Sequence, residues 1–149
     1  MNDVILPRIL SSTGTFIGRA NGRDYHLIPQ IAKSTACDGF ELMLLEDWSE
    51  RLPAVCDFLL ASGFLPETVH LEKNIGVLLS AGTEKCAGEA LEIFRRDIVA
   101  ASRLGARLAV LHFWGGRLSD YHMDKNLPLI PLFYDIAAES GILLTIENI

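Results

Sequence analysis

One pattern recurs along this chain and constrains its fold more than any other feature. From about residue 36 onward, a short apolar run rich in Val, Ile and Leu is followed by a polar loop and then by a segment with helical spacing. The apolar runs predict strands at 40–44, 68–71, 108–113 and 142–146, with an earlier strand inside 4–10. Because parallel strands need a long connection between them, this alternation predicts an α/β fold with one parallel sheet.

The segments between these strands have the spacing of amphipathic helices. Apolar residues recur every three or four positions on three faces: Trp48, Leu52, Val55 and Leu59; Ala87, Leu91, Phe94, Ile98 and Ala101; and Leu129, Leu132, Phe133, Ile136 and Ala137. Gly63, Gly105 and Gly141 follow these faces and are natural helix ends. A weaker helix is expected at 27–36, with Pro29 in its first turn. The sequence therefore predicts about five strands and four helices.

This count leaves two architectures open. A complete five-stranded doubly wound sheet of flavodoxin type suits a chain of 149 residues. A (β/α)8 barrel takes about 250 residues, so the same units would otherwise form a partial TIM barrel with its helices outside, truncated after the fifth strand. In both architectures the ligand site lies at the carboxyl ends of the strands, so the residues there decide between them.

Composition restricts the class of protein. Half of the residues are hydrophobic, which is enough for one sizeable core and hence one domain. We expect no membrane partner, since no apolar stretch approaches the roughly 18 residues of a spanning helix, and the first residues lack an export signal. A formal net charge of −6 disfavours nucleic acid as a partner. Cys37, Cys56 and Cys86 are far apart, which predicts reduced thiols in a cytoplasmic protein.

The loop after the first apolar run is a candidate phosphate site. Residues 11–15 read Ser-Ser-Thr-Gly-Thr, and their backbone amides would suit a phosphate group. A phosphate loop of this type leads directly into a helix, whereas here residues 16–24 intervene with two further glycines. We therefore favour an ordinary turn, and a flavodoxin-like ligand-binding module without catalysis remains the alternative.

Ionisable side chains follow three of the expected strands. His70 and His112 lie next to the ends of the strands expected at 68–71 and 108–113, and Glu147 directly follows the strand expected at 142–146. Because parallel neighbours lie about 4.8 Å apart, successive strands would bring the three side chains to one site about 10 Å across. Two imidazoles and one carboxylate form a ligand set for a divalent metal ion. The alternative is that strand order or side-chain direction keeps them apart as structural residues.

Two further residues are candidates for substrate binding. Glu41 is a lone carboxylate among apolar neighbours, so it either pairs with a basic group or contacts a substrate. Trp114 follows His112 into a glycine-rich loop, where its ring either covers the face of a sugar or fills the core.

Several segments together resemble the sugar phosphate isomerase/epimerase family of the xylose isomerase-like TIM barrel superfamily, which also includes the apurinic endonucleases. The segments are Gly39-Phe40-Glu41-Leu42, the strand with His70, Leu104-Gly105-Ala106 before the strand with His112, and Ile146-Glu147-Asn148. Each motif is short, and their order and spacing carry the resemblance. It covers nearly the whole chain, and implies that residues 1–149 are the N-terminal part of one barrel domain.

The resemblance implies a site and a reaction. It implies that Glu147 binds a divalent metal ion (Mn, Mg, Zn or Co) beside the acid/base chemistry, with His70 and His112 as further ligands. The reaction is metal-assisted proton transfer next to the carbonyl of a small sugar or sugar phosphate, by an isomerase or epimerase. An apurinic endonuclease-like phosphodiester hydrolase is the second enzymatic alternative.

The family completes its site with residues from strands six to eight, which this sequence lacks. We therefore expect the chain to be a fragment that is inactive alone, and the natural protein to continue for roughly another 100 residues. The exposed barrel edges also predict self-association.

Overall fold

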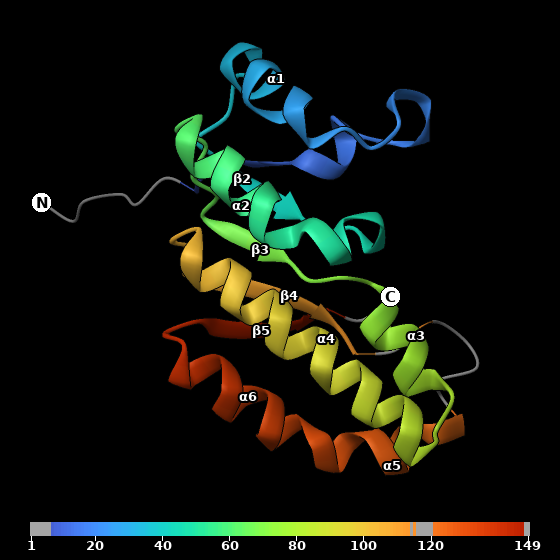
Figure 1. Cartoon of the computed structure of the whole chain (residues 1–149). Coiled ribbons are helices and arrows are strands. Elements are labelled where there is room, and N and C mark those ends of the chain that lie inside the picture. The colour runs from blue at the N-terminus through green and yellow to red at the C-terminus, as the bar shows by residue number, and fades with distance from the viewer. Residues whose placement is uncertain (1–6, 114, 116–120, 148–149) are drawn as a thin grey trace, which may run out of the picture.

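The computed structural model describes residues 7–113, 115 and 121–147. Five parallel strands form one sheet in the order β1-β2-β3-β4-β5. Their bounds are β1 Leu10–Ser12, β2 Gly39–Met43, β3 Thr68–His70, β4 Leu108–His112 and β5 Leu143–Glu147. A flavodoxin-type sheet places its first strand between the second and third, so this consecutive order excludes the doubly wound alternative. A curved run of consecutive β/α units is a partial barrel (Figure 1).

The described helices lie mainly on one face of the sheet. Their bounds are α1 Ile28–Ser34, α2 Leu52–Ala61, α3 Asn74–Ser80, α4 Glu84–Arg103, α5 Met123–Asn126 and α6 Ile130–Glu139. Helix α2 contacts α4, and α4 contacts α6, so these three form one layer beside the strands (Figure 1). None of the described helices combines the length and the apolar character needed to cross a membrane.

The core lies between this helical layer and the sheet. Successive strand residues point to opposite faces, so every second one is buried under the helices. These buried residues are Leu42, Val69, Ala109, Leu111 and Leu144. From the helices, Phe94 and Phe133 pack edge to face with ring centroids 4.5 Å apart. The core between the helices and the sheet therefore holds the strands in place without contributions from side chains on the opposite face of the sheet.

The opposite face is the inner face of the partial barrel, and it is open. The strand register places Met43, His70, Val110 and Thr145 at one level of this face. The same register pairs His112 with Glu147 one level nearer the carboxyl ends. Side chains of one level come from neighbouring strands, so the inner face brings together residues distant in sequence.

The structure differs from the sequence-based expectation at strand β1 and at the short helices α3 and α5, neither of which was expected. The first strand was expected inside 4–10 but is formed by Leu10–Ser12, because the ladder begins where Leu10 pairs with Gly39. Residues 1–6 of the expected range lie outside the described residues. Helix α3 was not expected, because no side chain caps its start and Gly76 interrupts its short apolar sequence.

Gly88 within α4 and Gly105 just after it form a matched pair that tests where the helix ends. Gly105 follows α4 with φ +75°, whereas Gly88 lies within the helix, and an added Cβ would meet nothing within 4 Å at either position. We expect Gly105→Ala to lower the free energy of unfolding by about 1 kcal/mol, because only glycine is unstrained at positive φ. Gly88→Ala should raise it by about 0.5–1 kcal/mol. Urea denaturation measures both, and effects of the same sign would contradict the helix end described here.

Candidate metal centre

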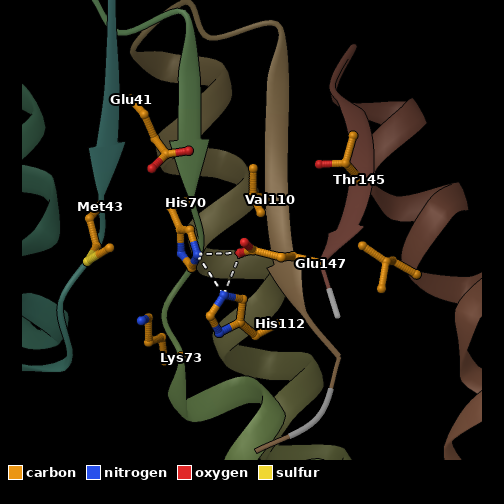
Figure 2. A pocket seen from close by; sticks show the side chains of 9 residues that line it. Glu41, Met43, His70, Lys73, Val110, His112, Thr145 and Glu147 are labelled. Atoms are coloured by element: carbon orange, nitrogen blue, oxygen red, sulfur yellow. Dashed lines mark hydrogen bonds and ion pairs between the residues drawn. The ribbon is translucent and has the colours of Figure 1, made fainter. Parts of the chain in front are cut away.

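Three strand ends position the candidate ligands. His70 is the last residue of β3, His112 the last of β4 and Glu147 the last of β5. All three have the strand parity that points to the inner face, and Figure 2 shows their side chains converging from the three strands. The structure therefore brings together the three residues that the sequence placed at successive strand ends.

The donor atoms of these residues lie within contact of one another. His112 Nε2 is 2.7 Å from Glu147 Oε2 and 2.9 Å from His70 Nε2. His70 Nε2 is 3.5 Å from the same Glu147 oxygen. Both histidine side chains are buried, whereas the Glu147 side chain is 52% exposed. The cluster thus combines two buried imidazoles with one carboxylate that is accessible to a ligand.

The three side chains direct more lone pairs at one another than they have protons to share. His70 Nδ1 lies 2.9 Å from Leu71 O, and because a carbonyl only accepts, Nδ1 carries the proton of the neutral ring. Its Nε2 then presents a lone pair to His112. His112 Nε2 has only one proton to donate, yet it faces both that lone pair and the Glu147 carboxylate. A cation among the three atoms would satisfy all of them.

Electrostatics favours the protonation states that bind metal. Burial lowers the pKa of His112, and the hydrogen bond to Glu147 only partly opposes this effect. The hydrogen bond from His112 in turn lowers the pKa of Glu147. At neutral pH the imidazole is therefore neutral and the carboxylate is ionised, which are the forms that coordinate a metal ion.

The donor set fits a divalent transition metal. Nitrogen and oxygen donors bind tetrahedral Zn²⁺ at about 2.0–2.2 Å, so two donors of one ion lie about 3.3–3.6 Å apart. Of the three separations in the cluster, 3.5 Å matches this range, while 2.7 and 2.9 Å are shorter by less than about 1 Å, so small side-chain movements would admit an ion. Imidazole nitrogen suits Zn²⁺ and similar ions better than it suits Mg²⁺, which prefers oxygen.

The cluster forms one wall of a cavity of about 640 Å³ on the inner face. Glu41 and Lys73 line the same cavity (Figure 2). Among the described residues Glu41 has no ion-pair partner, so the structural pairing that its sequence context left open is not found there. Trp114, the other expected substrate-binding residue, lies outside the described residues.

Sequence reasoning did not single out the other residues that line this cavity, among them Met43, Lys73 and Thr145. A signal for two of them was present, because Met43 lies two positions after Glu41, and Thr145 two before Glu147, on the same strand face. Lys73 follows the end of β3 in a loop, where strand parity gives no guidance.

The candidate phosphate loop has a structural role instead. Residues Thr13–Thr15 form a short 3-10 turn, and Ser12 caps it by accepting a hydrogen bond from the Gly14 amide. Thr13 is fully buried, and its hydroxyl accepts a hydrogen bond of 2.9 Å from the Met43 amide. The loop thus continues the contact between β1 and β2 and does not lead directly into an α-helix.

Comparison with known proteins gives no match by sequence and several by structure. No family model and no curated protein matches the sequence. A D-tagatose 3-epimerase-like protein superposes with a TM-score of 0.68 and 18% identity over 96% of this chain. The D-allulose 3-epimerase of Methylomonas sp., solved with D-allulose, gives a TM-score of 0.65 and 16% identity over 94% of this chain.

A third match by structure is a xylose isomerase domain protein from Planctomyces limnophilus. It superposes with a TM-score of 0.55 and 11% identity over 84% of this chain. The matched regions cover 53%, 51% and 49% of the three neighbours, so this chain spans about half of their length.

Fold and cluster together define a partial α/β barrel with candidate metal ligands on its inner face. It shares its fold with the D-tagatose 3-epimerase-like protein, the D-allulose 3-epimerase and the xylose isomerase domain protein, as the sequence resemblance predicted.

Proposed function

We propose that this chain supplies the metal-binding half of a sugar isomerase or epimerase site. The observation that carries the proposal is the convergence of His70, His112 and Glu147 on the inner face of a fold shared with solved sugar epimerases. The substrate class is a small sugar or sugar phosphate. The reaction is proton transfer at the carbon next to a carbonyl group.

His70, His112 and Glu147 would hold the ion. When bound, a divalent metal polarises the carbonyl and the neighbouring hydroxyl of a sugar, which makes the adjacent C–H more acidic. The two imidazoles favour Zn²⁺, Co²⁺ or Mn²⁺ over Mg²⁺ at this site.

The chain's own carboxylates account for the remaining chemistry in this half of the site. Glu147 is half exposed, so it can face a bound substrate and act beside the acid/base step. Glu41 lines the same cavity without an ion-pair partner among the described residues, which suits it to accept hydrogen bonds from sugar hydroxyls. Trp114 remains a proposed cover for the sugar face.

Turnover is proposed to need a complete barrel. The structural neighbours are about twice as long as the matched region, and five strands line only part of a closed barrel. We propose that metal and sugar binding belong to this chain, that the second acid/base group comes from outside the five described strands, and that the open edges of this sheet favour self-association. A cytoplasmic location is proposed on its three free cysteines.

The test uses D-allulose with Mn²⁺, whose unpaired electrons speed the relaxation of nearby protons. We expect the Mn²⁺-loaded chain to enhance relaxation of the D-allulose protons well beyond free Mn²⁺, because the sugar binds beside the ion. Proton NMR with and without protein measures this, and the Glu147→Gln variant is the control. No enhancement by a chain that holds Mn²⁺ would contradict sugar binding at this site.

The same experiment separates the alternative enzyme class. Duplex DNA with an abasic site replaces D-allulose, and its proton relaxation is compared at equal Mn²⁺ occupancy. Enhancement with the DNA but not with the sugar would move the assignment to phosphodiester hydrolysis.

A further inference from the structure

One peptide group links the metal cluster to a buried carboxylate. The carbonyl of Leu71 lies 2.9 Å from His70 Nδ1, and the N–H of the same peptide, on Glu72, donates to Asp97 Oδ2 over 2.8 Å. The sheet ladder ends one peptide earlier, where the Leu71 N–H donates to Val110 O over 2.9 Å. Both polar groups of this peptide are therefore committed, one to a candidate ligand and the other to Asp97.

Asp97 lies in α4, is fully buried, and uses its two oxygens separately. Oδ2 accepts the Glu72 amide, while Oδ1 accepts from Arg96 Nη2 over 2.8 Å and from Arg96 Nε over 3.1 Å. Arg96 Nη2 also donates to Glu72 Oε2 over 2.7 Å. Burial raises the pKa of Asp97 to about 6, with Arg96 opposing the shift, so the carboxyl group is ionised at neutral pH.

The direction of these bonds determines their effect on His70. A carboxylate that accepts a peptide N–H polarises the peptide and makes its carbonyl oxygen a stronger acceptor. A stronger acceptor at Leu71 O keeps the His70 proton on Nδ1 and leaves Nε2 as the lone pair that faces His112 and Glu147. Metal-binding histidines are commonly oriented by such a bond from the second ring nitrogen.

We propose that Asp97 is a positioning residue of the metal site, acting through the Leu71–Glu72 peptide to fix the ring and tautomer of His70. This role of Asp97 in metal binding rests on the proposed function. The tautomer itself is a property of the metal-free chain and can be measured without any ligand.

The experiment compares the unaltered chain with Asp97→Asn and with Asp57→Asn as the matched control. Asparagine keeps the size of the side chain and removes its charge. Asp57 lies in α2 and pairs with Arg103, so its replacement removes one carboxylate without touching the peptide. Long-range ¹H–¹⁵N NMR of the metal-free chain identifies the protonated nitrogen of His70, and competition with a chromophoric chelator gives the Zn²⁺ affinity.

We expect the unaltered chain and Asp57→Asn to carry the His70 proton on Nδ1. Asp97→Asn should lose this preference and bind Zn²⁺ about 10–100-fold more weakly. A folded Asp97→Asn protein with the Nδ1 tautomer and unchanged Zn²⁺ affinity would overturn the proposal.

Two measurements on the unaltered chain decide the proposal even if Asp97→Asn does not fold. The Glu72 amide should resonate downfield and exchange slowly, as expected for a bond to a carboxylate, and a fast-exchanging amide would overturn the link. A His70 ring protonated at Nε2 would overturn it as well. If the unaltered chain binds no Zn²⁺, the proposed function fails, while the tautomer comparison still decides the role of Asp97.

Discussion

Replacing Glu147 with Gln is expected to lower the affinity of the chain for Zn²⁺ by about 100-fold. The carboxylate supplies the one formal negative charge among the three donors, and the pKa lowered by His112 keeps it ionised at neutral pH. A neutral amide oxygen is a much weaker ligand for a divalent ion. Competition with a chromophoric chelator at fixed pH measures the change.

Glu139→Gln is the matched control for this prediction. Glu139 is an exposed residue at the end of α6, in the outer helical layer, so its replacement changes the charge by the same amount away from the site. Its Zn²⁺ affinity should equal that of the unaltered chain. Wild-type affinity in Glu147→Gln, or an equal loss in both variants, would show that the cluster does not hold the ion.

Replacing Phe94 with Ala is expected to lower the free energy of unfolding by about 3–5 kcal/mol. The Phe94 ring is fully buried on α4 and packs edge to face against Phe133 of α6. Its removal loses this contact and leaves a cavity between the helices and the sheet. Urea denaturation followed by circular dichroism measures the change.

Val99→Ala controls for a substitution in the same helix. Val99 is 63% exposed, so its truncation should change the free energy of unfolding by no more than about 0.5 kcal/mol. A loss below about 1 kcal/mol in Phe94→Ala would show that the helical layer is not packed on the sheet as described.

Sequence patterns predicted the elements that pack one apolar face into the core. The strands ending at His70 and His112 come from apolar runs that have one face under the helices, and such runs are readable in sequence. Helix α3 was missed because its seven residues have no capping side chain and include Gly76. The start of β1 depends on its pairing with β2, which is a tertiary property.

The candidate site was predictable where it depends on strand parity alone. His70, His112 and Glu147 end successive strands, and the parallel order of those strands brings their side chains to one face. The hydrogen bond from the Glu72 amide to Asp97 was not predictable from sequence. These two residues are 25 positions apart and meet only through the packing of α4.

A crystal structure of the chain grown with Zn²⁺, with anomalous scattering recorded at the zinc edge, tests the central claim most directly. We predict one strong anomalous peak on the inner face, bound by His70 Nε2, His112 Nε2 and a carboxylate oxygen of Glu147. A chain saturated with Zn²⁺ that shows no peak among these three residues, or a peak only elsewhere, would contradict the metal site and the function built on it.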